Sequence, residues 1–260
     1  MTILDKIIER KRIEVEKAKA LVPSEDLLNY PYFSVACLSL RESILDPEKT
    51  GIIAEYKRAS PSKGNINSTA KVEDVVRAYE EAGASAVSVL TDADFFKGNL
   101  QDLSKAREAI NIPILRKEFI VDKYQITEAK AYGADVILLI AACLTREEVQ
   151  EFAAYAHQIG LNVLLEVHNE QELLDNLFDD IDAIGVNNRN LKDFTVDLQH
   201  SYDLLDKIPS EYIKVSESGI SDPKTIKALK SAGFQSFLIG ENFMRTADPG
   251  KAIKDFVRAL

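Results

Sequence analysis

Residues 135–167, DVILLIAACLTREEVQEFAAYAHQIGLNVLLEV, contain one complete repeat of strand, helix and strand. The run at 135–140 is apolar at successive positions, as expected for a strand that helices cover on both faces. A polar-apolar helical stretch follows at 145–159, and Gly160 marks its end. The run at 161–167 is again apolar along its length. The segment therefore predicts two parallel strands joined by a helix.

The same alternation extends through the chain on both sides of this segment. Further strands are expected at 51–57, 85–90, 112–117, 181–186, 212–218 and 236–240. Further helices are expected at 71–82, 100–110, 123–132, 169–178, 198–207, 222–232 and 249–259. Eight strands alternating with eight helices predict an α/β fold, a single (β/α)8 TIM barrel. A doubly wound open sheet is the alternative, but no GxGxxG motif follows any of the strands.

The segment before the first strand has a different pattern. Residues 2–20 are predicted to form an amphipathic helix, and Thr2 with Asp5 resembles a capping box at its start. We therefore expect an N-terminal helical extension at 1–50, packed on a barrel domain at 51–260.

Composition excludes several classes of protein. The 260 residues are 46% hydrophobic, enough for a sizeable core. Lys and Arg number 32 against 42 Asp and Glu, and the net charge of −10 argues against binding nucleic acid. Cys37 and Cys143 form no CxxC motif, so neither a disulfide framework nor a zinc site is indicated. A charged N-terminus and the lack of long apolar runs predict a cytoplasmic protein without a membrane partner.

Polar residues stand where several of the expected strands end. They are Glu55, Lys57, Lys117, Glu166, Asn187, Arg189, Glu217 and Glu241. In a barrel the carboxyl ends of all strands form one face, so these side chains would gather at one mouth and form an active site. The alternative is an ion-pair network that only stabilises the barrel rim.

Glycines follow the last two strands and indicate an anion site. Ser218–Gly219 and Gly240–Glu241 occupy positions where many barrels bind phosphate with main-chain N–H groups. A phosphorylated small molecule is therefore the expected ligand. The alternative is that these glycines only make tight turns.

Seven segments resemble the indole-3-glycerol phosphate synthase family in the same order. They are IIAEYKRASPSKG, ILRKEFIVDKYQI, DVILLIAACL, VLLEVHNEQEL, AIGVNNRNL, VSESGI and FLIGENFM. The resemblance covers almost the whole chain and includes a helical segment ahead of the barrel. It implies a lyase of tryptophan biosynthesis that uses no cofactor and no metal. Such a lyase closes the indole ring of 1-(2-carboxyphenylamino)-1-deoxyribulose 5-phosphate with loss of carbon dioxide and water.

The resemblance also implies roles for individual residues. Lys117 matches the general acid that protonates the ribulose carbonyl, and Glu166 matches the general base of the dehydration. Lys57 matches the lysine that pairs with the substrate's carboxylate and phosphate, and Glu55 matches the carboxylate that orients the lysines.

The remaining matches describe the walls of the same site. Its other polar groups are Asn187, Arg189, Glu217 and Ser218; the phosphate donors are at Gly219, Gly240 and Glu241; the mobile loop contains Ser60 and Pro61; and the apolar ring pocket is Phe96, Phe119, Leu138 and Ile140. Some relatives have a small residue in place of Glu241, whose side chain would repel phosphate if it pointed inward. Strand alternation places Tyr56 on the opposite face from Glu55, in packing and not in chemistry.

Three matters stay open at this point. The chain is expected to be a monomer or weak homodimer, and association with other tryptophan-pathway enzymes is left open. The histidines His157, His168 and His200 have no metal-binding spacing and suggest surface or supporting positions. Other activities on the same scaffold are a sugar-phosphate isomerase, a Schiff-base aldolase with Lys117 as nucleophile, or a noncatalytic phosphate-binding module.

Overall fold

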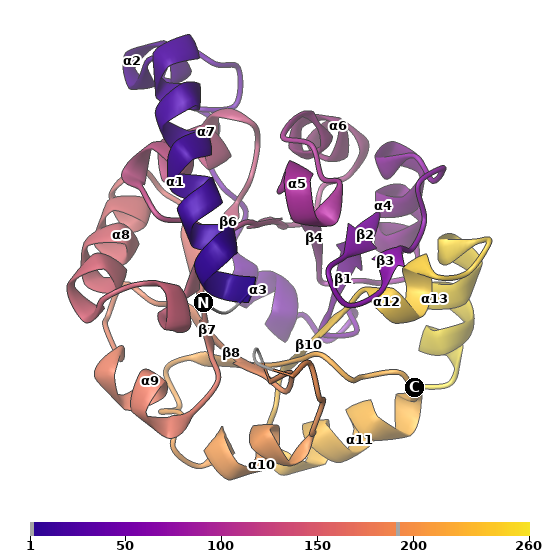
Figure 1. Ribbon diagram of the computed structural model, residues 1–260. Coiled ribbons are helices and arrows are strands. Elements are labelled where there is room, and N and C mark those ends of the chain that lie inside the picture. Colours follow the sequence, from indigo (N-terminus) through magenta and orange to yellow (C-terminus); the bar gives the residue numbers. More distant parts are fainter. Residues whose placement is uncertain (1–2, 191–192) are drawn as a thin grey trace.

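The computed structural model describes residues 3–190 and 193–260. Within these residues, eight parallel strands close into a barrel in the order β1-β10-β9-β8-β7-β6-β5-β4, which confirms the predicted TIM barrel (Figure 1). The strands are β1 (Ile52–Tyr56), β4 (Ala86–Leu90), β5 (Ile114–Lys117), β6 (Val136–Ile140), β7 (Asn162–Val167), β8 (Ala183–Asn187), β9 (Ile213–Glu217) and β10 (Ser236–Ile239). Because the sheet closes on itself, the open-sheet alternative is wrong.

The predicted helices form a ring around the barrel (Figure 1). They are α4 (Val72–Glu81), α6 (Gln101–Ala109), α7 (Lys123–Ala131), α8 (Arg146–Gln158), α9 (Glu170–Asp175), α10 (Gln199–Leu205), α11 (Pro223–Ala232) and α13 (Pro249–Arg258). Thr145 and Glu148 form a reciprocal capping box at the start of α8. Outward-facing strand residues such as Val87, Leu139 and Phe237 pack with these helices in one continuous core.

Several shorter elements have no counterpart among the predictions. They are α2 (Ser24–Leu27), α3 (Leu40–Leu45), the antiparallel pair β2 (Ala59–Ser60) and β3 (Gly64–Asn65), α5 (Ala93–Phe96) and the 3₁₀ helix η1 (Ala141–Cys143). Each has two to six residues, which is too few to show a helical or strand period. The short helix α12 (Glu241–Met244) begins at the predicted phosphate turn after β10.

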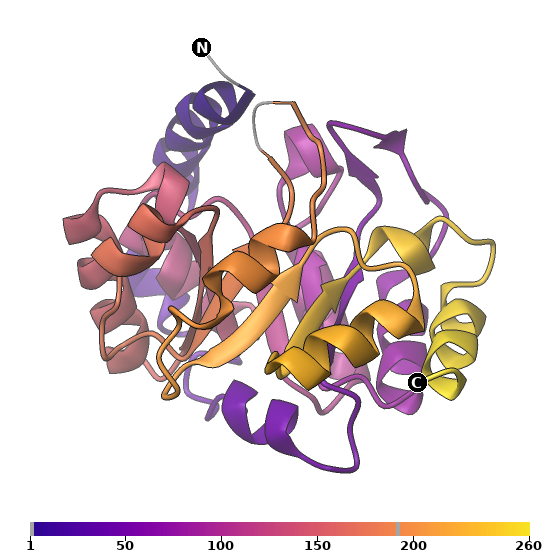
Figure 2. The same cartoon turned by 90° about the horizontal axis from the view of Figure 1, so that it is seen from below.

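Helix α1 (Ile3–Leu21) confirms the predicted amphipathic helix, whereas Thr2 of the expected capping box lies outside the described residues. Its middle residue Val15 packs with Val121 and Tyr124, which follow β5 in the chain. The helix crosses one end of the barrel (Figures 1 and 2). Among the described helices, none combines the length and the apolar character needed to cross a bilayer.

Helix α3 closes the opposite end of the barrel, below the strands in Figure 2. Its residues Leu40 and Ile44 are buried together with the inward-facing Ile53 and Leu115. The N–H group of Leu40 donates to the Asn162 side chain at the start of β7, over 3.2 Å. One end of the barrel is therefore sealed, and only the carboxyl ends of the strands can open into a site.

Candidate active site

Because side chains alternate along a strand, the polar residues at the strand ends face the barrel mouth. On β1, Ile53 packs inside the barrel, so Glu55, two residues further on, faces the same way. Tyr56 faces outward, is 1% exposed in the surrounding core, and donates its hydroxyl to the Ala70 carbonyl over 2.7 Å. The prediction that Tyr56 has a packing role is therefore confirmed.

One cavity of about 530 Å³ occupies this mouth. The predicted site residues all line it: Glu55, Lys57, Ser60, Pro61, Phe96, Lys117, Phe119, Leu138, Ile140, Glu166, Asn187, Arg189, Glu217, Ser218, Gly219, Gly240 and Glu241. Ile3, Leu4 and Ile7 of α1 also line the cavity, and no functional role is predicted for them. The apolar spacing of Ile3 and Ile7 indicates a buried helix face but not what the face covers.

The Lys117 ammonium lines the cavity and lies between two carboxylates. Its Nζ is 3.0 Å from Glu166 Oε2 and 2.7 Å from Glu217 Oε2. Burial alone would lower the pKa of Lys117, but the negative charges of Glu166 and Glu217 outweigh burial and raise it. Lys117 is therefore a cation at neutral pH.

Glu166 is held from three sides. Besides Lys117, the Asn187 amide donates to its Oε1 over 3.0 Å, and His168 Nε2 lies 3.3 Å from the same oxygen. Burial alone would raise the pKa of Glu166, but the Lys117 charge and His168 lower it, so this carboxylate is ionised. Burial disfavours the cationic form of His168, yet Glu166 and Glu172 raise its pKa to about 10. His168 thus has the supporting position that the sequence suggests.

Glu217 has the opposite electrostatic balance. Burial, assisted by the charges of Glu166 and Glu55, raises its pKa to about 7 despite the contact with Lys117. Its Oε1 has no hydrogen-bond partner within the described chain. A Cβ atom at position 185 would stand 2.1 Å from this oxygen, so Gly185 on the adjacent strand leaves the space that Glu217 needs.

A second lysine and carboxylate pair lies on β1 and just after it. Lys57 Nζ is 2.6 Å from Glu55 Oε1, and both side chains are largely buried. A Cβ atom at position 240 would stand 2.5 Å from that oxygen. Gly240 therefore makes room for the Glu55 carboxylate, a role that its position after β10 does not reveal.

An apolar wall faces these charges. Phe96, at the end of α5, and Phe119, just after β5, have ring centroids 6.1 Å apart. Leu138 and Ile140 extend the wall along the inner face of β6. A planar aromatic ring is the natural occupant of such a surface.

The predicted phosphate side has turns with unusual backbone. Ser218 and Gly219 both have positive φ angles, 69° and 80°. Such a conformation is uncommon for serine and typical of functional turns. The Glu241 carboxylate lies 3.6 Å from Lys63 Nζ at the rim, so this side chain has a cationic partner there.

Comparisons with known proteins agree on one family. The family model described as indole-3-glycerol phosphate synthase matches residues 4–256. The indole-3-glycerol phosphate synthase of Bacteroides thetaiotaomicron is 47% identical over 258 residues, covering 99% of this chain and 98% of that one. The Burkholderia vietnamiensis enzyme of the same name is 43% identical and covers 96% of this chain and 97% of its own.

Solved structures with low sequence identity share the fold. A tryptophan synthase complex from Pyrococcus furiosus matches with a TM-score of 0.62 at 16% identity, over 82% of this chain and 98% of that one. A 3-hexulose-6-phosphate synthase from Salmonella typhimurium matches with a TM-score of 0.60 at 12% identity, over 81% of this chain and 98% of that one. At these identities the likeness supports the barrel fold alone.

Proposed function

The chain belongs to the indole-3-glycerol phosphate synthase family, which acts in tryptophan biosynthesis, and on that premise we propose a division of labour among the residues of its cavity. Lys117 is the general acid and Glu166 is the general base. Lys57 binds the carboxylate and phosphate of the substrate, and Glu55 orients both lysines. The arrangement of Lys117 between two buried carboxylates carries this proposal.

The first task is the attack of an aromatic carbon on the ribulose carbonyl. This carbon is a weak nucleophile, so the carbonyl oxygen must receive a proton as the new bond forms. The Lys117 ammonium supplies that proton. The raised pKa of Lys117 keeps the group charged before substrate arrives. The ring becomes cationic during closure, and the ionised Glu166 stabilises that charge.

The later steps restore aromaticity. Loss of carbon dioxide leaves its bonding electrons in the ring and so neutralises the ring's positive charge. Dehydration then removes a ring proton together with the hydroxyl group. Glu166 accepts this proton because its carboxylate is ionised and held in orientation by Asn187. A lysine ammonium protonates the departing hydroxyl, which leaves as water. Two protons are donated over the whole reaction and Glu166 accepts one, so one proton from solvent restores the charged lysines.

The substrate would lie with its aromatic ring against Phe96 and Phe119 and its phosphate at the turns after β9 and β10. Arg189 and Ser218 complete the polar side, with main-chain N–H groups of Gly219, Gly240 and Glu241 as phosphate donors. Ser60 and Pro61 belong to the loop that would cover the bound substrate. The oligomeric state, contacts with other tryptophan-pathway enzymes, and the cytoplasmic location stay predictions.

A Schiff-base aldolase is the main competing activity. The charges around Lys117 favour this activity less than they favour acid catalysis. A lysine nucleophile must lose its proton, whereas Glu166 and Glu217 raise the pKa of Lys117. Borohydride treatment with a carbonyl substrate is therefore expected to leave Lys117 unmodified. A stable adduct at Lys117 would favour the aldolase.

The direct test is Lys117→Ala with turnover followed by indole fluorescence. We expect turnover to fall by at least about 10²-fold while substrate affinity stays within about tenfold, because the proton acts mainly in the transition state. Lys105→Ala is the matched control, since Lys105 is an exposed lysine on α6. Near-normal turnover in Lys117→Ala would remove Lys117 from the role of acid.

A further inference from the structure

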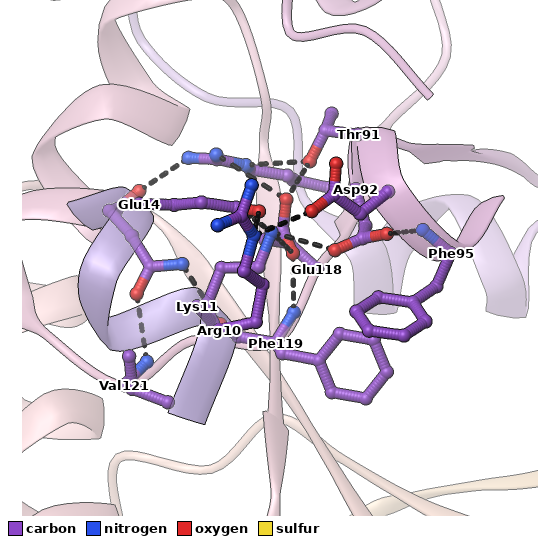
Figure 3. Close-up of polar contacts among 12 residues, drawn as sticks. Arg10, Lys11, Glu14, Thr91, Asp92, Phe95, Glu118, Phe119 and Val121 are labelled. Carbon is purple, nitrogen blue, oxygen red and sulfur yellow. Dashed lines mark hydrogen bonds and ion pairs between the residues drawn. The ribbon is translucent and has the colours of Figure 1, made fainter. Parts of the chain in front are cut away.

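Helix α1 contributes a buried cation to the barrel. Lys11 is only 4% exposed although α1 lies outside the strands. Its Nζ is 2.8 Å from Asp92 Oδ2, 3.1 Å from Glu118 Oε1 and 2.7 Å from Glu14 Oε2 (Figure 3). Burial disfavours the ammonium, but Glu118 and Asp92 raise the pKa of Lys11 above its ordinary value. Two of its three partners belong to the barrel and not to α1.

Each of the two barrel carboxylates holds one side of the apolar wall. Asp92 Oδ1 accepts the N–H group of Phe95 over 2.7 Å and thereby caps α5, which ends at Phe96. Glu118 Oε1 accepts the N–H group of Phe119 over 2.9 Å. Both carboxylates thus connect Lys11 to the backbone beside a wall phenylalanine (Figure 3).

Lys11 is the main cation that neutralises the carboxylates of Asp92 and Glu118. The side chains of Asp92 and Glu118 are 2% and 4% exposed, so water screens them little. Arg116 is the nearby alternative, but its Nη2 lies 3.9 Å from Glu118 and 2.7 Å from Glu128. Without Lys11, two carboxylates on neighbouring loops would repel each other or admit water.

We propose that Lys11 is a positioning residue that sets the spacing between Phe96 and Phe119 through Asp92 and Glu118. The inference rests on the proposed function, because it assumes that the substrate's aromatic ring lies against these two phenylalanines. Lys11 does not touch the reacting atoms. Its effect therefore falls on the binding of the ring and not on the binding of the phosphate.

The test compares Lys11→Met with wild type in two constants, KM for the substrate and the inhibition constant of inorganic phosphate. Methionine is of similar length and removes the charge. We expect KM for the substrate to rise about tenfold, with a smaller change in kcat, because uniform binding of the ring is weakened. The inhibition constant of inorganic phosphate, a probe of the other end, should stay within about twofold.

Two further variants separate positioning from general loss of stability. Lys11→Arg keeps the cation and should restore KM to within about threefold of wild type. Lys17→Met removes an exposed lysine from the same helix and should change neither constant. If Lys11→Met does not fold, Asp92→Asn removes one of the charges while keeping an acceptor for the α5 cap, and its KM should also rise.

The outcomes are distinct. An unchanged KM in Lys11→Met, with only a lower melting temperature, would overturn the proposal and leave Lys11 as a stabilising contact of α1. An equal weakening of substrate binding and of inorganic phosphate binding would overturn the proposal as well. Failure of the proposed function is visible separately, because wild type itself would then show no turnover or Lys117→Ala would be active.

Discussion

At the scale of single residues, the cavity gives two neighbouring glutamates different protonation behaviour. Glu166 has a lowered pKa because Lys117 and His168 outweigh burial, whereas burial and negative neighbours raise the pKa of Glu217 from 4.5 to about 7. The difference arises from partners, since both side chains are almost fully buried. Only one of the two is therefore a permanent anion near neutral pH.

The raised pKa of Glu217 predicts a pH-dependent stability. The folded protein holds this proton more tightly than the unfolded chain, so Glu217 makes folding progressively less favourable as pH rises from 4.5 through about 7. Relative to wild type, Glu217→Gln should gain about 1–2 kcal/mol in free energy of unfolding between about pH 5 and 8. Denaturant unfolding measures this difference, with Glu108→Gln on the exposed side of α6 as control. A pH-independent difference between Glu217→Gln and wild type would contradict the assignment.

At the scale of elements, the size and exposure of the segment after β1 agree with the prediction that it is a mobile loop. The pair β2 and β3 has two residues in each strand, and Pro61, Ser62 and Lys63 between them are exposed. So small an antiparallel pair has little stability of its own. The rim contact between Lys63 and Glu241 connects this segment to the proposed phosphate site after β10.

Binding of indole-3-glycerol phosphate should order this segment and slow tryptic cleavage after Lys63 several-fold, because a closed lid withdraws the peptide from the protease. Fragment analysis over time measures the rate, and Lys63→Gln identifies the fragment because it removes the cleavage site. Equal cleavage with and without the ligand would show that the segment does not close.

At the scale of the whole molecule, the barrel is sealed at one end by α3 from the N-terminal segment. Leu40 is 1% exposed and packs with inward-facing strand residues, whereas Leu45, on the same helix, is 51% exposed. The inner core therefore includes residues that precede the first strand.

Leu40→Ala should lower the free energy of unfolding by about 2–5 kcal/mol, because it leaves a cavity inside the barrel. Leu45→Ala is the matched control and should change stability by less than about 0.5 kcal/mol. Thermal unfolding followed by circular dichroism distinguishes them. Similar midpoints for both variants would mean that α3 does not seal the core.

Local patterns specify much of this protein. Buried parallel strands are apolar along their length, so the eight strands and the barrel can be read from runs such as 135–140. The positions of Lys117 and Glu166 at strand ends are enough to place them at one mouth, because all carboxyl ends share one face. The membership of the chain in its family is equally visible in the order of its motifs.

Other features depend on contacts between segments that are distant in the sequence. Nothing near Lys11 indicates that it pairs with Asp92 and Glu118, since those residues meet only when α1 packs across the barrel. Gly185 and Gly240 look like ordinary strand and turn glycines until Glu217 and Glu55 fill the space beside them. The pKa values of Glu166 and Glu217 differ for the same reason, because burial and charge spacing exist only after the strands have closed into a barrel.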